Sequence, residues 1–225
     1  MKVGFVFECG PQGADKQVCE YLARQIRPEI TPVSRTLDNK QNLLEDAGKV
    51  AAMLLAEGCE RVLIVWDLRP AWPDKKNKPC RKDEREAILI AVANAGLADR
   101  PVFLVCVEQE LESWLLADEA KISAYLSRPA HPYAARRVSK PDREPNPKAA
   151  MMNHFKLARG WRYQDYTHAI KVLQAGETDL KKLRRSPTFQ RFEAKLQQEL
   201  PSQRSAGETG FIIDRMGGVD EDGGS

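Results

Sequence analysis

Apolar and polar positions in the first half of the chain follow two alternating patterns. Continuous apolar runs at residues 2–7, 62–66 and 102–107 predict strands that are covered on both faces of a sheet. Between these runs, apolar residues recur every three or four positions, which predicts helices at residues 41–57 and 83–95. Alternating strands and helices are typical of a doubly wound sheet. The sequence therefore predicts an α/β fold with a mostly parallel sheet flanked by helices.

Shorter signals add detail to this pattern. Asp15 is a good N-cap for a helix that follows the first apolar run. Residues 30–33 are expected to form a short strand, which Pro32 places at an edge of the sheet. A helix that begins near Glu110 would bury three apolar side chains, those of Leu111, Trp114 and Leu115.

Acidic side chains stand at the ends of all three apolar runs. Glu8 follows the first run, Asp67 the second and Glu108 the third, and Glu110 and Glu112 come soon after. The carboxyl ends of parallel strands share one edge of a sheet, so these carboxylates are expected to converge there. Clustered carboxylates favour a hard divalent cation, here Mg²⁺ or Mn²⁺. For Glu110 and Glu112 taken alone, complementing a helix dipole is an equally good interpretation.

The composition changes after residue 126. Residues 127–147 contain five prolines and no sustained periodicity, which indicates a proline-rich basic linker or flap. Helical spacing returns over residues 148–200, and the tail at residues 201–225 is expected to be disordered. The sequence thus predicts an α/β domain over residues 1–126, joined by the linker to a basic C-terminal helical region.

Charge is segregated along the chain, although the net charge is only +3. Residues 1–118 hold 16 basic and 19 acidic side chains, whereas residues 119–205 hold 18 and 8. A basic second half suits a polyanion such as nucleic acid, and a merely solvated basic surface is the alternative. Trp161, Tyr163 and Tyr166 alternate with basic residues there, which suits either single-stranded nucleic acid or the core of a small domain.

Several classes of protein are disfavoured by what the sequence contains. The five cysteines are scattered without a C-x-x-C pair, which indicates neither a disulfide framework nor a zinc site. The three histidines, His131, His154 and His168, lack metal-ligand spacing and are expected at the surface. The apolar runs are too short for a membrane span or a signal peptide, so no membrane association and a cytoplasmic location are expected.

A basic loop follows the second acidic strand end. Lys75, Lys76 and Arg81 lie beyond Asp67 among several prolines, where they could hold a phosphodiester. A solvated lysine loop is the more frequent cause of this pattern. The chain has no P-loop and no G-x-G-x-x-G motif, which makes an enzyme for small nucleotides the less favoured class.

Four short motifs together resemble a known group of proteins. They are Glu8 with Gly10, the E-x-E-x-W-L-L-A-D stretch at residues 110–118, Pro147 with Lys148, and the S-x-x-F motif at residues 186–189. In these the chain resembles a bacterial Toprim-like family of unknown function, which is distantly similar to the overcoming-lysogenization-defect nucleases. The resemblance covers most of residues 1–200.

This resemblance implies roles for individual residues. Glu8 matches the Toprim glutamate, a ligand or general acid/base, and Asp67 matches the first aspartate of the D-x-D motif. Arg69 stands where the second aspartate is expected, which would weaken a second metal and add a phosphate contact. Lys148 joins the candidate phosphate-binding residues. The resemblance also implies a partner ATPase in a phage-defence or mobile-element system.

Our leading hypothesis is a metal-dependent nuclease acting on DNA or RNA. Its candidate catalytic residues are Glu8, Asp67, Glu110 and Glu112, and its candidate metal ligands are Glu8, Asp67, Glu108 and Glu112. The alternative is a Toprim-like module that binds nucleic acid or an acidic partner without catalysis, for which Arg69 is the best argument.

Overall fold

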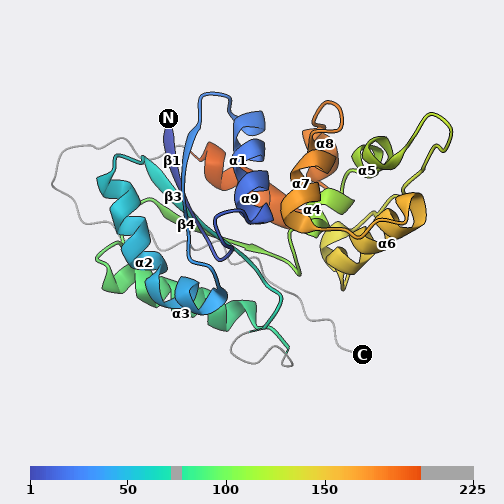
Figure 1. Ribbon diagram of the computed structural model, residues 1–225. Coiled ribbons are helices and arrows are strands. Elements are labelled where there is room, and N and C mark those ends of the chain that lie inside the picture. Colours follow the sequence, from blue (N-terminus) through green and yellow to red (C-terminus); the bar gives the residue numbers. More distant parts are fainter. Residues whose placement is uncertain (72–77, 199–225) are drawn as a thin grey trace, which may run out of the picture.

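The computed structural model describes residues 1–71 and 78–198, and its centre is a parallel sheet of four strands (Figure 1). The strands are β1 (Lys2–Phe7), β2 (Thr31–Thr36), β3 (Arg61–Asp67) and β4 (Val102–Val107), in the order β2-β1-β3-β4. All neighbouring pairs are parallel. The predicted α/β fold with a parallel sheet is confirmed. The strand at 30–33 lies at an edge as expected but extends further, to Thr36.

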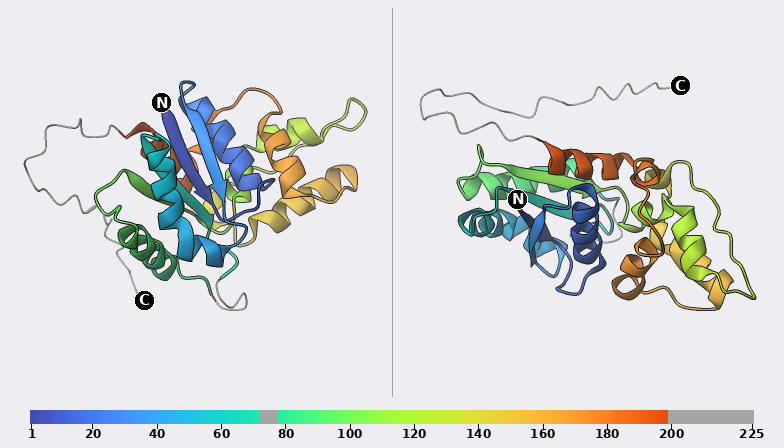
Figure 2. Two further views of the ribbon diagram at one scale, coloured as in Figure 1. Left: turned by 60° about the vertical axis from the view of Figure 1, so that its left-hand side comes forward. Right: turned by 90° about the horizontal axis from the view of Figure 1, so that it is seen from above.

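Helices cover both faces of the sheet, as Figures 1 and 2 show from three directions. On one face α2 (Lys40–Ala56) and α3 (Arg81–Asn94) pack over alternate strand residues such as Ile64 and Trp66. On the other face α1 (Ala14–Ile26) packs over Phe5 and Val65. Burial on both faces explains why the strands read as continuous apolar runs and not as alternating ones.

The second half of the chain is helical and adjoins the sheet. Its elements are α4 (Glu112–Leu116), α5 (Glu119–Leu126), a 3₁₀ turn (Pro141–Arg143), α6 (Pro147–Arg159), α7 (Asp165–Leu173), α8 (Leu180–Leu183) and α9 (Pro187–Gln197). The last helix returns to the sheet, where the ring of Phe192 lies 6.3 Å from that of Phe5. Arg61 of β3 donates hydrogen bonds of 2.9 and 3.2 Å to two carbonyls near the end of α9. The helical region and the sheet thus share one hydrophobic core.

The proline-rich segment 127–147 is anchored to the helical region. Its Asp142 is buried and accepts a hydrogen bond of 2.8 Å from the backbone amide of Thr188, at the start of α9. The Ser127 hydroxyl accepts a hydrogen bond of 2.9 Å from the amide of Tyr133. These contacts hold the segment against α9 and across its own first turn.

Three local predictions need correction. The N-cap of α1 is Gly13, so Asp15 lies inside the first turn and does not cap the helix. The helix expected near Glu110 begins at Glu112. His154 and His168 are partly buried and bonded, to the Tyr133 hydroxyl and the Gln164 amide respectively, because each packs beside aromatic rings of the helical region.

The strand order creates a topological switch between β1 and β3. The chain leaves β1 toward β2 on one side and returns to β3 on the other, so the loops after β1 and β3 diverge at the carboxyl edge. In open α/β sheets, ligands bind in the crevice that such a divergence leaves. Glu8 and Asp67 stand at the ends of these two strands.

Candidate active site

Four carboxylates gather at the carboxyl ends of β1 and β3. Glu8 directly follows β1, Asp67 is the last residue of β3, Asp15 lies in the first turn of α1, and Glu112 begins α4. The charges of Asp15, Glu8 and Glu112 all act on Asp67. Sheet topology and two helix starts therefore bring together acids from four separate segments.

Burial dominates the protonation of this carboxylate cluster. It raises the pKa of Glu8 from 4.5 to about 8, with Asp15 and Glu84 adding to the rise and Lys40 opposing it. It raises the pKa of Asp15 to about 6. The pKa of Asp67 is raised well above its usual value by burial and then by its acidic neighbours. Carboxyl groups with such pKa values are typical of functional sites, because ordinary surface acids are solvated.

Glu112 belongs to the same cluster although it lies in a helix. It is only 4% exposed, and burial raises its pKa to about 7, with Lys148 opposing and Glu110 adding to the rise. A carboxyl group that titrates near neutral pH can both accept and release a proton under physiological conditions.

Two carboxylate oxygens of the cluster are buried without a hydrogen-bond partner among the described residues. They are Oε2 of Glu8 and Oδ1 of Asp67. Lys40 is a buried cation whose charge acts on Glu8, but its Nζ donates to the carbonyls of Asp67 and Pro70 and pairs with Glu84 at 3.2 Å. An unpaired polar atom in a buried position is costly, so these two oxygens are suited to accept a hydrogen bond or to bind a cation.

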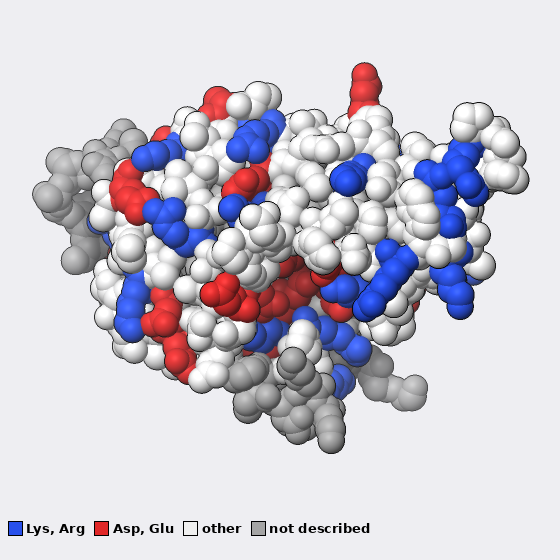
Figure 3. All heavy atoms as spheres, viewed as in Figure 1, with Lys and Arg blue, Asp and Glu red and all other residues white. Residues whose placement is uncertain are grey.

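A cavity of about 460 Å³ opens onto three of the four carboxylates of the cluster, and Glu8 lies outside its lining. Asp15, Asp67 and Glu112 line it together with Glu110 and Lys148. In Figure 3 acidic side chains fill a hollow in the middle of one face, and Lys and Arg side chains border its lower and right sides. The cavity therefore combines an acidic floor with a basic rim.

Gly13 shapes the wall of this cavity. A Cβ atom at this position would lie 2.4 Å from the side chain of Cys9, so the loop between β1 and α1 can close only around a glycine. The amide of Gly13 donates a hydrogen bond of 2.8 Å to the carbonyl of Gly10, which tightens the turn. This turn directs the first residues of α1, including Asp15, toward the strand ends.

Lys148 occupies the basic side of the cavity. Its backbone amide donates a hydrogen bond of 3.1 Å to Oε2 of Glu110, and its ammonium group forms an ion pair with Asp165. Glu110 thereby positions the first turn of α6 at the cavity, and the Lys148 side chain remains 42% exposed for an incoming anion.

The donor chemistry of the cluster suits a hard cation, but its side chains do not enclose one. Within residues 1–71 and 78–198, no three His, Cys, Asp or Glu side chains are close enough to hold a metal ion together. Mg²⁺ is commonly held by only one or two carboxylates, with water and substrate phosphate oxygens completing its shell. The unpartnered oxygens of Glu8 and Asp67, on adjacent strands, fit that open type of site.

Other residues expected at the site are placed apart from the cluster. Glu108 pairs with Arg81 at 2.8 Å and with Arg191 at 3.5 Å, and neither Glu108 nor Arg81 lines the cavity. Arg69 is exposed, and no carboxylate of the described residues lies within 4.0 Å of its guanidinium. Arg69 therefore forms no ion pair with Asp67, although only one residue separates them in the chain.

Two candidate phosphate-binding residues, Lys75 and Lys76, lie outside the described residues. Conversely, sequence reasoning missed Asp15, the buried Lys40–Glu84 pair and Asp165. Asp15 could have been suspected, because a short turn separates it from Glu8. The Lys40–Glu84 pair leaves no such signal, since 44 positions separate the two residues and Glu84 lies in a run of charged residues at the start of α3.

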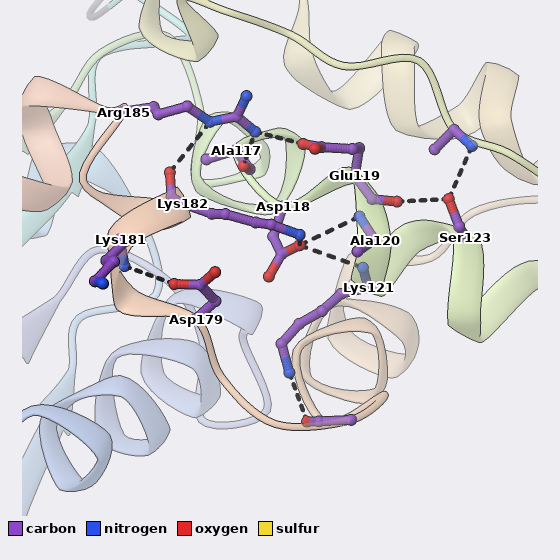
Figure 4. Close-up of polar contacts among 12 residues, drawn as sticks. Ala117, Asp118, Glu119, Ala120, Lys121, Ser123, Asp179, Lys181, Lys182 and Arg185 are labelled. Carbon is purple, nitrogen blue, oxygen red and sulfur yellow. Dashed lines mark hydrogen bonds and ion pairs between the residues drawn. The ribbon is translucent and has the colours of Figure 1, made fainter.

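The E-x-E-x-W-L-L-A-D stretch divides into two parts. Its glutamates line the cavity, whereas its second half joins helices. Trp114 donates a hydrogen bond of 2.8 Å from Nε1 to the buried hydroxyl of Thr188. Asp118 caps α5 and pairs with Lys182 at 3.0 Å, and Arg185 contacts the residues on either side of Asp118 (Figure 4). The second half of this motif therefore serves to join helices, and only its glutamates belong to the site.

Fold and site together define an α/β protein with a buried carboxylate cluster at the switch point of a parallel sheet. A family model described as a domain of unknown function, DUF4276, matches residues 12–197, and the chain belongs to this family. Comparisons with curated proteins and with solved structures give no match. In the described part of the chain, no helix is long and apolar enough to cross a membrane. The Toprim resemblance stays a prediction.

Proposed function

We propose that this protein is a nuclease that hydrolyses phosphodiester bonds of DNA or RNA with the help of Mg²⁺ or Mn²⁺. The observation that carries the proposal is the pair of buried, unpartnered oxygens of Glu8 and Asp67 at the switch point. Two carboxylates on adjacent strand ends, beside a cavity with a basic rim, suit a cation that bridges the protein and a phosphate.

The residues around the cavity have distinct roles in this proposal. A bound metal ion would activate water and neutralise charge on the phosphoryl oxygens. Glu112, with a pKa of about 7, accepts the proton that the attacking water loses. Lys148, which Glu110 holds at the cavity, binds the phosphate oxygens, and the exposed Arg69 contacts the phosphate from outside the cavity. Hydrolysis leaves a phosphate monoester on one fragment and a hydroxyl group on the other.

The biological setting of the proposal rests on resemblance alone. The Toprim-like motifs support a partner ATPase and a role in phage defence or a mobile element. A nuclease of this kind would act in the cytoplasm, where its nucleic-acid substrate lies. Nuclease assays are therefore best run with the isolated protein and again with an ATPase encoded nearby.

The experiment that tests the proposal compares cleavage of labelled single- and double-stranded DNA and RNA, with and without Mg²⁺ or Mn²⁺. Native protein should cleave only with metal, and Glu8→Gln and Asp67→Asn should lose at least about a hundredfold in rate, as expected when a catalytic group is removed. Glu29→Gln is the matched control, because Glu29 is an exposed glutamate that precedes the amino end of β2. Cleavage that persists in Glu8→Gln would refute the assignment.

A second candidate function is a nucleic-acid-binding module without catalysis. The observation in its favour is that no three donor side chains of the described residues come together around one point. Calorimetric titration with Mg²⁺ and Mn²⁺ separates the two candidates. Saturable binding by native protein that is lost in Asp67→Asn supports the nuclease, whereas nucleic-acid binding without any metal binding supports the module.

A further inference from the structure

A second concave surface lies on α6, outside the carboxylate cavity. This α6 groove has a volume of about 500 Å³, and its lining includes Met152, Asn153, Lys156, Trp161, Arg162 and Tyr163. Met152 and Trp161 are each 45% exposed. Large apolar side chains that share an open groove with cations commonly mark a binding surface.

The ring of Trp161 is held in place by the end of α6. The helix is capped by Gly160 with φ 68°, and the amide of Trp161 donates a hydrogen bond of 3.3 Å to the carbonyl of Phe155. The guanidinium carbon of Arg159 lies 4.5 Å from the centroid of the Trp161 ring. A ring fixed in this way offers an ordered stacking surface at little entropic cost.

The charges around the ring select the ligand. Lys156 and Arg162 line the groove and are exposed, Arg159 stacks on the ring, and no acidic side chain is found among the described residues that line the groove. A partner must therefore offer negative charge and flat apolar rings together. Single-stranded nucleic acid has both, whereas in a duplex the faces of the bases are already stacked.

The groove and the carboxylate cavity lie close together at two places in the chain. Lys148 lines the cavity, and the next residue of α6, Ala149, lines the groove. Tyr163 lines the groove too, and the charges of Glu112 and Asp165 act on its buried hydroxyl. From Lys148 to Lys156 the helix rises about 12 Å, a length of about three to four stacked nucleotides.

We propose that the α6 groove binds single-stranded nucleic acid, with a base stacked on Trp161 and phosphates held by Lys156 and Arg162. The strand then runs along α6 to Lys148 and into the carboxylate cavity. This inference rests on the proposed function for the fate of the strand, because it names a single strand as the substrate. Binding in the groove itself requires neither a metal ion nor the carboxylates.

The test is fluorescence anisotropy with labelled oligonucleotides of about twelve residues, within the site sizes of single-strand binding proteins. Single-stranded DNA, single-stranded RNA and the duplex are titrated separately with the full chain in EDTA. Trp161→Ala should weaken single-strand binding about tenfold, and Trp161→Phe should stay within about threefold, since a smaller ring still stacks. Leu157→Ala should bind like native protein, because Leu157 is 69% exposed on α6 but does not line the groove.

Salt dependence provides a second measurement. Lys156 and Arg162 in the groove, together with Lys148 at the cavity, make three cations that contact phosphates. They give a slope of about −2 in a plot of log affinity against log salt, and Arg162→Ala should reduce its magnitude by about 0.7. Circular dichroism and thermal unfolding are measured as well, to check that each variant is folded. Duplex binding as tight as single-strand binding overturns the inference, and so does equal binding by native protein and Trp161→Ala.

Failure of the inference and failure of the proposed function give different results. Single-strand binding that depends on Trp161, without cleavage in Mg²⁺ or Mn²⁺, supports the groove and refutes the nuclease. Metal-dependent cleavage with binding unaffected by Trp161→Ala supports the nuclease and refutes the groove. If DNA and RNA bind equally, base stacking and phosphate contacts account for the binding. A preference for RNA indicates additional contacts to the 2′-hydroxyl.

Discussion

Replacing Glu8 by Gln should stabilise the folded protein at high pH. The fold buries this carboxyl group at the end of β1, where Asp15 and Glu84 lie close enough to disfavour its charge. Its Oε2 has no hydrogen-bond partner among the described residues. Glutamine has nearly the same shape and no charge, so the substitution removes the cost of burying an anion while keeping the packing.

The magnitude follows from the pKa. Burial raises the pKa of Glu8 from 4.5 to about 8, so the folded protein holds a proton that the unfolded chain releases between these values. The stability of the native protein therefore falls as pH rises through this range. The full difference corresponds to about 5 kcal/mol. Because Glu8 titrates together with its acidic neighbours, we expect about 2–5 kcal/mol.

The assay is urea unfolding without divalent ions at about pH 5 and about pH 9, on either side of the titration. Glu8→Gln should exceed native stability by about 2–5 kcal/mol at the higher pH and by less than about 1 kcal/mol at the lower. Glu29→Gln is the control. The pKa of Glu29 is lowered by a backbone hydrogen bond and by Arg27, so its removal gives no gain at high pH. An advantage of Glu8→Gln that is equal at both pH values, or larger at pH 5, would refute the reasoning.

Three further substitutions test separate parts of the structure. Arg69→Asp restores the D-x-D spacing and should strengthen Mg²⁺ binding about tenfold in calorimetric titration. Arg69→Ala should lower nuclease turnover and leave metal affinity within about twofold. Unchanged metal affinity in Arg69→Asp would show that a carboxylate at this position does not reach the metal ion. Gly48→Ala places a Cβ 2.0 Å from the carbonyl oxygen of Ala91. Thermal unfolding should therefore show that the free energy of unfolding falls by about 1–3 kcal/mol or more. An unaltered melting temperature would contradict the contact between α2 and α3. Thr188→Val leaves the buried Nε1 of Trp114 without its acceptor and should cost about 1–3 kcal/mol in urea unfolding, with Thr188→Ser closer to native.

The sequence predicts the sheet well because its strands are buried on both faces. The run at residues 102–107 matches β4 at both ends, and that at residues 62–66 differs from β3 by one residue at each end. Helix ends are less well predicted, since caps depend on tertiary contacts. Asp15 has the chemistry of an N-cap, yet Gly13 takes that position because the turn beside Cys9 admits only a glycine.

The candidate site is predicted only in part, because it too depends on tertiary structure. Glu8 and Asp67 are found from the rule that parallel strands end at one edge, and the structure sets them on adjacent strands. Glu108 obeys the same rule but ends the edge strand β4, where Arg81 and Arg191 pair with it. The order of residues along the chain does not show that Glu8 and Asp67 belong to the site whereas Glu108 does not. The strand order decides which acids are neighbours, and the helix packing decides which of them are buried.

The carboxylate cluster runs against the local preferences that the rest of the fold obeys. By contrast, two buried carboxylates elsewhere in the described residues are each paired with a cation, Glu84 with Lys40 and Glu193 with Arg184. At the switch point, several acids instead lie buried close together, and burial raises their pKa values. Without a cation, the repulsion between these carboxylates and the cost of burying their charges are lowered only when the carboxyl groups hold protons. A divalent ion would lower both by displacing the protons, so metal affinity and proton release are linked. Because proteins retain destabilising arrangements mainly where function requires them, the cost of this cluster is itself an argument for a ligand at the ends of β1 and β3.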